Sequence, residues 1–490
     1  MFSARNSLDF RLLLAFFSLS LSETALAQEQ PPPDDAEPDL EVLAAPKAPT
    51  GTVPAPAPPQ VPAASPQSLA SPSAPAVAAK PTQQLAAESE RQPAPTPLTS
   101  PAADPHALKI SAYIQGQFVH NRVSEDQLQQ GGAPLNQDQF MVRRGRISFD
   151  RTWKYAGGGL ELDANTVRGP SVGIRRAEAS LFYRGDNAVS LPPLVTLTVG
   201  VSDIPFGYEL LESAKERWFM DRTVGSSALF PSEADLSAKL SGAYRFLRYA
   251  LAVGNGEPLD SRGFPRDPNA AKDAVGRFGV DLSAAERIGL WGGTSFAYGK
   301  GFHAGTEATK DSVQWRDDNE DGRIDQGELV ALPGRGAAPS ENFARWAIGL
   351  DLGASLQTPL GTSRLYAEGF VASSYDRGFV PSDPVAAAAP IRQAGAYVAL
   401  TQELWRHGIV GFRASFYDPN SDVIETRADK ALPKTQTVKT FSPLAGFQLP
   451  ERARLLFQYD FVRDYLGRDE LGVPADAEND QWTVRLQVQL

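Results

Sequence analysis

The chain has 490 residues, 40 prolines, no cysteine and a net charge of −11. Without cysteine it has neither a disulfide framework nor a thiolate metal site. The negative charge is concentrated in two stretches, because residues 28–106 hold nine acidic and three basic residues and residues 310–328 hold seven and three. The rest of the chain is therefore close to neutral, and its charge does not identify a binding partner.

The first 27 residues have the layout of a cleavable secretory signal. Arg5 and Arg11 precede the apolar run at residues 12–21, and Ala25-Leu26-Ala27 follows this run before Gln28. Such a run is too short to span a membrane, and no later run reaches the roughly 20 apolar residues that a membrane helix needs. We therefore predict a signal peptide at residues 1–27 and export of the chain.

Residues 28–106 are dominated by proline, alanine, serine and glutamine, and they hold 20 of the 40 prolines. A segment of this composition buries too little apolar surface to offset the entropy lost on ordering. We predict a disordered Pro/Ala-rich periplasmic linker, which is either a plain spacer or a tether to periplasmic or cell-wall components.

From residue 107 onward, apolar and polar residues alternate in segments of about ten residues, as in "RWAIGLDLG" at 345–353. In a strand this spacing puts the apolar side chains on one face and the polar ones on the other. Sixteen such segments are predicted: 109–120, 139–152, 155–165, 171–184, 193–201, 235–246, 247–256, 273–283, 288–299, 342–354, 361–374, 390–401, 406–418, 436–448, 451–464 and 480–490.

The connections between these segments alternate between short and long, as expected for an all-β, 16-stranded antiparallel transmembrane β-barrel over residues 107–490. A soluble β-sandwich also has alternating strands, but it gives no reason for the loop lengths to alternate. The last segment, "QWTVRLQVQL" at 481–490, is predicted to pair with the first, since an open edge in lipid leaves backbone groups unsatisfied.

Several stretches, in order, resemble the phosphate-selective porin O/P family of trimeric outer-membrane channels. They are "FMVRRGRISFD" at 140–150, "TVGVSDIPFGYELLESAKERWFMDRT" at 198–223, "RYALAVGNGE" at 248–257, "GRFGVDL" at 276–282 and "FRASFYDPNSD" at 412–422. The resemblance covers residues 107–490 and implies a homotrimer in the bacterial outer membrane. Where the family usually has Gln or Lys before the Pro-Phe-Gly of 205–207, this chain has Val201-Ser202-Asp203.

Side chains at alternate positions of a strand face opposite sides, and this parity predicts which cationic groups face the lumen. Guanidinium groups stay charged and hold phosphate or carboxylate through paired donors, so they favour anion passage. The predicted lumen cations from the strands are Arg144, Arg146, Arg176, Arg277, Arg345 and Arg413, together with Lys239, Arg454 and Arg485. Acidic residues fall on the same faces, at Asp150, Glu178, Asp281, Asp351 and Asp460, which leaves a weakly selective pore as an alternative.

The loop at residues 202–234 is long enough to fold back and narrow the lumen, as the resemblance implies. Lys215, Arg217 and Arg222 are then the predicted constriction cations, with Glu212, Glu216 and Asp221 opposing them.

The sequence "DDNEDGRIDQGE" at 317–328 fits the twelve-residue calcium loop of an EF-hand position by position. Oxygen donors recur at alternate positions, Gly322 permits the sharp turn and the final glutamate is able to bind with both oxygens. The predicted ligands are Asp317, Asn319, Asp321, the Arg323 carbonyl, Asp325 and Glu328. We predict structural Ca²⁺ and no organic cofactor; a solvated acidic loop is the alternative.

The sequence as a whole predicts an outer-membrane channel for passive diffusion of small hydrophilic solutes, with small anions such as phosphate preferred. A weakly selective general diffusion porin and a non-conducting anchor or adhesin are the alternatives. No enzyme is expected, because the four histidines are scattered and the sequence contains no serine-nucleophile elbow, no phosphate-binding glycine loop and no histidine metal motif. The expected partners are outer-membrane lipid and further copies of the chain, and no nucleic acid.

Overall fold

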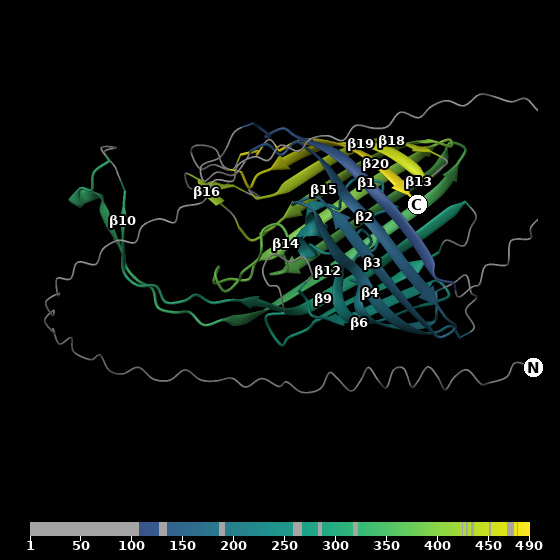
Figure 1. Ribbon diagram of the computed structural model, residues 1–490, viewed down its shortest axis with the longest axis horizontal. Coiled ribbons are helices and arrows are strands. Elements are labelled where there is room, and N and C mark those ends of the chain that lie inside the picture. Colours follow the sequence, from purple (N-terminus) through teal and green to yellow (C-terminus); the bar gives the residue numbers. More distant parts are fainter. Residues whose placement is uncertain are drawn as a thin grey trace, which may run out of the picture. The chain divides into compact units, whose positions relative to one another are not determined.

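The computed structural model describes residues 107–126, 135–185, 192–257, 267–282, 287–316, 322–423, 425–427, 430–432, 436–449, 452–467, 475–477 and 479–490. Sixteen antiparallel strands form one closed barrel, each paired with its neighbour in the chain (Figure 1). The predicted fold class is therefore confirmed, and all sixteen predicted segments correspond to barrel strands.

The bounds of the barrel strands are β1 Lys109–Asn121, β2 Gln139–Thr152, β3 Ala156–Asn165, β4 Ser171–Tyr183, β5 Val195–Asp203, β6 Ala234–Tyr244, β7 Leu247–Gly254, β8 Asp273–Asp281, β9 Ile288–His303, β12 Glu341–Thr358, β13 Gly361–Ser373, β14 Arg392–Leu404, β15 Gly408–Asp418, β18 Val438–Leu449, β19 Ala453–Asp464 and β20 Gln481–Gln489. Strands β9 and β12 are longer than predicted, since their ladder runs from Ile288↔Leu356 to His303↔Glu341.

Four short strands were not predicted. They form two hairpins outside the barrel, one from β10 (Ser312–Trp315) and β11 (Leu329–Leu332), the other from β16 (Glu425–Arg427) and β17 (Lys430–Leu432). These strands have three or four residues each, too few for an alternating pattern to be recognised. The described residues also contain one short helix, α2 (Val224–Leu229), and a 3₁₀ turn at Gln326–Glu328.

The last strand closes the barrel as predicted. Strand β20 pairs with β1 from Asn121↔Gln481 to Tyr113↔Gln489, and with β19 on its other side. Each of the sixteen strands thus has two neighbours, so no strand edge is left open to lipid.

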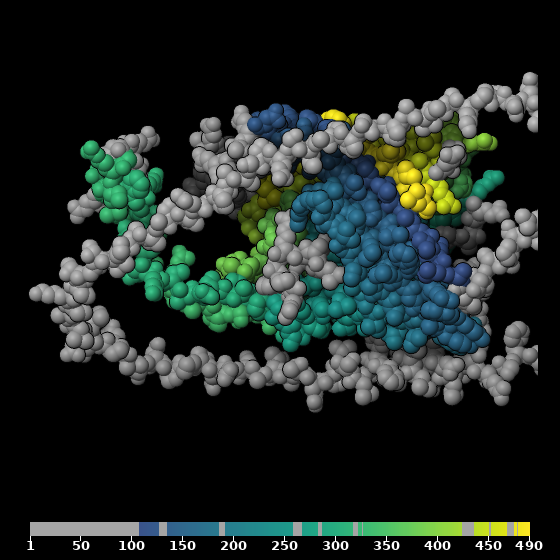
Figure 2. All heavy atoms as spheres, in the orientation of Figure 1, coloured from purple at the N-terminus to yellow at the C-terminus, as the bar shows by residue number. Residues whose placement is uncertain are grey.

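The barrel is apolar outside and polar inside. Along β12, Ile348, Leu350 and Leu352 are 53–62% exposed, whereas Arg345 and Asp351 are 3% and 1% exposed. This is the reverse of a water-soluble core and is the pattern of a barrel surrounded by lipid. Over β1 to β5, the side chains form a continuous wall (Figure 2). In the described residues, no helix is long and apolar enough to cross a membrane.

The longest and the shortest connections lie at opposite ends of the barrel. The short turns define what we call the turn end, for example 153–155, 245–246 and 359–360. The long connections 204–233, 304–340 and 374–391 define the loop end. One of them, residues 204–233, does not stay at the loop end, and its course decides how much of the lumen is open.

Candidate functional site

Residues 204–233, here called the inward segment, lie inside the barrel. Apolar side chains of the segment, including Ile204, Phe206 and Phe230, pack on small inward residues of the wall such as Ala297 and Ala347. A second cluster joins segment residues to the wall farther round the barrel: Trp218, Phe219 and Met220 pack against Tyr366, Tyr397, Ile409, Leu444 and Leu456. The segment is therefore held against strands β8 to β19 by buried apolar surface, which is a strongly stabilising arrangement.

A tight turn at the start of the inward segment is fixed by a buried carboxylate. Gly207 has a φ of +60°, and a Cβ at this position would come within 1.9 Å of the Glu368 carboxylate, so only glycine fits. Glu368 accepts hydrogen bonds from the backbone N–H groups of Tyr208 and Glu209, each at 2.9 Å. The Pro-Phe-Gly stretch is thus a docking turn on the wall of β13.

Amide and guanidinium groups from the closing strands hold the middle of the inward segment. Gln115 of β1 donates to the Ala214 carbonyl at 3.0 Å, and Gln487 of β20 donates to the Lys215 carbonyl at 3.0 Å. Arg485 of β20 donates to the Met220 carbonyl at 2.6 Å. These bonds satisfy buried backbone carbonyls that no ladder reaches.

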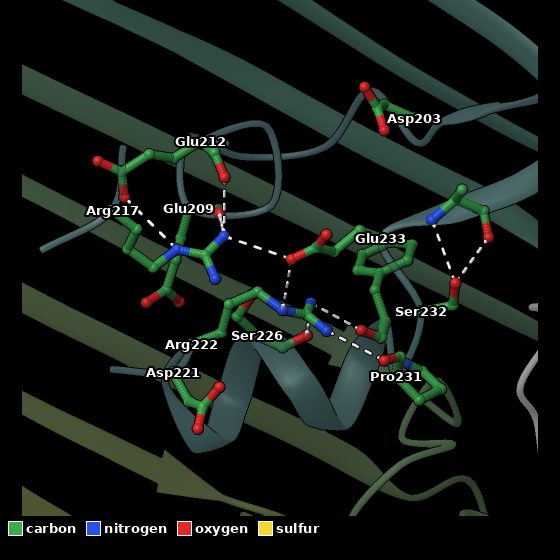
Figure 3. A network of polar contacts seen from close by, with 12 residues as sticks. Asp203, Glu209, Glu212, Arg217, Asp221, Arg222, Ser226, Pro231, Ser232 and Glu233 are labelled. Atoms are coloured by element: carbon green, nitrogen blue, oxygen red, sulfur yellow. Dashed lines mark hydrogen bonds and ion pairs between the residues drawn. The ribbon is translucent and has the colours of Figure 1, made fainter. Parts of the chain in front are cut away.

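At the end of the inward segment, Glu233 is the centre of an ion network (Figure 3). Its carboxylate lies 3.0 Å from Arg175, 3.5 Å from Arg146 and Arg217, and 3.9 Å from Arg222. Burial alone would raise the pKa of Glu233, but the four guanidinium charges hold that pKa well below its ordinary range. Glu233 is therefore ionised over the whole physiological pH range.

The open part of the lumen lies on the opposite side of the inward segment, along β2 to β8. An outer cavity of about 1240 Å³ is lined by β2 to β5, by the loop-end residues of β9 and β12, by the end of the inward segment and by residues 374–382. An inner cavity of about 240 Å³ toward the turn end is lined by residues of β5 to β8 and by Leu211. Lys239 of β6 and Arg176 of β4 project from the same wall.

Two β-bulges add arginines to this wall that parity alone would place on the outside. The register skips Arg143 between Gln115↔Arg144 and Gly116↔Val142, and it skips Arg175 between Glu161↔Arg176 and Leu162↔Ile174. Bulges re-aim side chains in this way. Arg143 and Arg175 consequently line the outer cavity. Sequence reasoning missed both, although the outward apolar residues change from even to odd positions across each bulge, from Val142 to Ile147 in β2 and from Ile174 to Leu181 in β4.

The predicted strand arginines lie on the lumen side. Arg454 bonds to the Glu216 carbonyl and to Gln487, Arg485 lies 3.9 Å from Asp221, and each of the other six has a closer acidic partner. The shortest ion pairs are Arg144–Asp221 at 3.1 Å, Arg146–Asp163 and Arg146–Glu233 at 3.5 Å, Arg176–Asp150 at 2.6 Å, Arg277–Asp351 at 2.5 Å, Arg345–Asp273 at 3.1 Å and Arg413–Glu209 at 3.0 Å. Their part in anion binding stays a prediction.

Two of the three predicted constriction cations, Arg217 and Arg222, bind backbone carbonyls of the inward segment, and the role of the three in a constriction stays a prediction. Arg217 is 3% exposed and donates to the carbonyls of Glu209 and Glu212 at 3.0 and 2.8 Å. Arg222 donates to the Phe230 and Pro231 carbonyls at 2.8 and 3.0 Å and so closes the end of α2 (Figure 3). In this geometry Arg217 and Arg222 hold the inward segment together, and Arg222 also lines the outer cavity.

The predicted calcium loop lies between β10 and β11. Three of its predicted ligands fall outside the described residues: Asp317, Asn319 and Asp321. Of the others, Gly322 has the expected left-handed backbone, with a φ of +69°. The buried carboxylate of Glu328 accepts from the Trp315 indole at 3.0 Å and from the Asp325 N–H at 3.2 Å. Among the described residues alone, no group of three His, Asp or Glu side chains is placed to hold a metal.

Comparison with known proteins finds similar architecture among solved structures of outer-membrane proteins. The chain matches no family model and no curated protein. Similar solved structures include Pseudomonas putida OprB, with a TM-score of 0.47 and 10% identity over 78% of this chain and 94% of that one. Acinetobacter baumannii DcaP has a TM-score of 0.45 and 9% identity over 78% of this chain and 97% of that one. Salmonella typhi OmpF has a TM-score of 0.43 and 11% identity over 79% of this chain and 98% of that one.

The class of protein follows from this chain's own construction. A closed sixteen-stranded barrel with an apolar outer face, a polar lumen, short turns at one end and long loops at the other is an outer-membrane β-barrel protein of porin architecture. The chain is thus a bacterial outer-membrane protein.

Proposed function

We propose that the protein is a passive channel for small hydrophilic solutes, with a preference for anions. The path runs from the outer cavity to the inner cavity, between the inward segment and the wall of β2 to β8. The observation that carries this proposal is the sign of the charged groups along that wall.

Cations outnumber carboxylates at both ends of the path. Eight arginines and five carboxylates line the outer cavity, and the inner cavity is lined by Arg248 and Arg277 with no carboxylate among its described lining residues. Between the two, Lys239 donates to the Asp203 carbonyl at 3.0 Å. Charged groups that line a narrow pore select ions of the opposite sign. The carboxylates paired with the arginines reduce this field, so the preference is moderate.

Phosphate is the anion to test first. A guanidinium binds phosphate through two parallel N–H donors, whereas it binds chloride as a point charge. The resemblance of residues 198–223 to the phosphate-selective porin O/P family supports the same choice. A general diffusion porin and a non-conducting anchor are the competing functions.

The test is reconstitution of the full exported chain in planar bilayers, with the reversal potential read in a KCl gradient and phosphate titrated in. We expect a Cl⁻/K⁺ permeability ratio above one and a current that phosphate reduces. Lys239→Gln should lower the ratio, whereas Lys154→Gln, on an exposed turn at the turn end, should leave it unchanged. Phosphate-insensitive current with a ratio near one would reduce the function to general diffusion, and a silent bilayer would favour the anchor.

We also propose that residues 317–328 bind one Ca²⁺ ion. Two features of the described half of the loop support this: Gly322 has the left-handed backbone that the sixth position of an EF-hand loop requires, and Glu328 turns its carboxylate inward beside Asp325. The role is structural, ordering the hairpin at the millimolar calcium found outside cells.

Calorimetry on the folded barrel in detergent should show one calcium site that is lost in Glu328→Gln. Calcium should also slow tryptic cleavage at Arg316 and Arg323 in the parent protein. Glu307→Gln, at an exposed position between β9 and β10, is the matched control and should bind calcium as the parent protein does. No calcium heat in the parent protein would mean that the loop is a solvated acidic surface.

The homotrimer expected from the resemblance is likewise a proposal. Unheated gel electrophoresis and native mass spectrometry of the detergent-extracted protein would give the number of chains. The predicted linker at 28–106 lies outside the described residues, and pull-down with purified cell wall tests its second reading as a tether.

A further inference from the structure

Arg377 differs from the other arginines of the outer cavity in the chemistry of its partners. Its Nε and Nη2 groups donate to the Leu229 carbonyl at 3.1 and 2.9 Å, and Nη1 donates to the Gly256 carbonyl. Its guanidinium stacks on the rings of Tyr375 and Phe230, 4.8 and 5.4 Å from their centroids. All of these groups are neutral.

Charge pairing among the eight cavity arginines is otherwise nearly complete. Six of them have a carboxylate oxygen within 4 Å: Arg143, Arg144, Arg146, Arg175, Arg222 and Arg345. Within the described part of the chain, Arg377 and Arg168 have none. Arg168 is exposed on the turn between β3 and β4, where water and salt screen its charge. Arg377 is half-buried, so its charge acts on the cavity with less screening.

The surroundings of Arg377 also keep the guanidinium rigid and partly available. Three of its five N–H groups are used by the carbonyls of Leu229 and Gly256, which leaves two for a ligand. Arg345 donates to the same Gly256 carbonyl at 2.8 Å, so a second guanidinium lies close by. Backbone bonds from Arg377 and Gly378 to the Ala228 carbonyl, at 2.9 and 3.0 Å, fix residues 374–391 on α2.

We propose that Arg377 is the principal anion-docking residue of the outer cavity, and that it favours oxyanions such as phosphate and carboxylate. A guanidinium that is held by neutral groups has no adjacent carboxylate to offset its positive charge, and its planar fork suits two oxygens of one ligand. This inference rests on the proposed anion channel and names the residue that gives the channel its oxyanion preference.

The experiment compares the parent protein with Arg377→Gln and Arg377→Lys, using inorganic phosphate as the probe. In bilayers, the phosphate concentration that halves the current should rise roughly tenfold or more in Arg377→Gln, as expected for loss of a charged hydrogen bond. Arg377→Lys should keep the chloride preference but bind phosphate more weakly. Arg463→Gln removes a positive charge at the loop end away from the cavity, where Arg463 pairs with Asp476, and should match the parent protein.

Calorimetric phosphate binding to the detergent-solubilised barrel separates this inference from the proposed function. If the parent channel prefers anions and Arg377→Gln binds phosphate equally well, the docking assignment is wrong and the channel stands. If the parent protein does not conduct but binds phosphate through Arg377, the channel proposal fails and the site remains. Equal loss of binding in the Gln and Lys variants, with altered thermal unfolding in both, would show that Arg377 only holds residues 374–391 on α2 and would overturn the inference.

Discussion

Two long connections at the loop end of the barrel take opposite courses. The inward segment, 204–233, folds into the lumen, and residues 304–340 continue the β9–β12 ladder outward as a paired stalk, through Thr306↔Ala338 and a Thr309–Arg335 backbone bond, to the β10–β11 hairpin (Figure 1). The first brings large apolar residues and charged groups that match charges on the wall. The second also carries large apolar residues, such as Trp315 and Val330, but they are exposed, as is every residue of its two four-residue strands.

The difference indicates that a loop folds into the lumen when the inner wall offers packing sites for its apolar side chains and partners for its charged groups. Phe206, Phe219 and Phe230 are 1–3% exposed, whereas Val313 and Val330 of the hairpin are 64% and 48% exposed. The wall opposite the inward segment offers small residues such as Ala297 and Ala347 where rings fit. The inward course is thus a property of the segment and the wall together.

The largest expected effect comes from Glu233→Gln. The change leaves four nearby guanidiniums without their shared carboxylate, and breaking a buried pair typically costs about 3–5 kcal/mol. We expect a lower urea midpoint for the folded barrel in detergent, followed by heat-modifiable gel mobility. Glu307→Gln on the exposed stalk is the control. An unchanged midpoint would mean that the network does not hold the inward segment.

Phe206→Ala should have the next largest effect. The ring is 3% exposed and packs at 4.9 Å from the Phe230 ring, so its loss leaves a cavity that costs about 3 kcal/mol. A loosened inward segment should also raise single-channel conductance. Val330→Ala in the exposed hairpin is the comparison, with both readouts unchanged. Equal behaviour of the two variants would contradict the contrast between the two connections.

Acidification should weaken the inward segment through Glu233. The native pKa is held below the unfolded value of about 4.3. The stabilisation is therefore complete above that value and is lost as pH falls through the native pKa. The difference in unfolding midpoint between the parent protein and Glu233→Gln should therefore be steady from pH 8 to about 5 and shrink below pH 4. Parallel pH profiles of the two proteins would show that other groups cause any loss of stability in acid.

The smallest effect is expected when residues 307–337 are replaced by an Asn-Gly turn, which continues directly from the Thr306↔Ala338 pair. The described residues of the stalk and hairpin contribute nothing to either apolar cluster on the inward segment. Barrel stability and conductance in chelator should match those of the parent protein, and only calcium binding should disappear. Slower assembly or a changed conductance would show that this connection acts on the barrel after all.

The strands were predictable from sequence because lipid and water impose alternation at every position. Arg345 and Asp351 on the lumen side, and Trp346, Ile348 and Leu350 on the outer side between them, follow the period of two without interruption. The bulges at Arg143 and Arg175 shift it by one residue, so the outward apolar positions change from even numbers (Val142, Ile174) to odd numbers (Ile147, Leu181), and counting only from the residues after each bulge hides the shift. Parity therefore found Arg144 and Arg176 but not their neighbours.

Partners were less predictable than positions. Lys215, Arg217 and Arg222 lie in the inward segment as the sequence indicated, but the sequence could not show that Arg217 and Arg222 bind backbone carbonyls of their own segment. Arg377 was missed for the reverse reason. It lies in a loop without alternation, and its lack of an acidic partner becomes visible only when every neighbouring guanidinium has been paired.

The closing strand gives the barrel an order of assembly. Gln487 and Arg485, which hold the Lys215 and Met220 carbonyls, belong to β20, the last strand to be made and the one that joins β19 to β1. Until that seam forms, the middle of the inward segment lacks these two hydrogen bonds and is held on this side only by other strands, through Gln115 of β1 and Gln458 of β19 among the described residues. Narrowing of the passage is therefore a late event, completed in the same step that seals the cylinder against the bilayer.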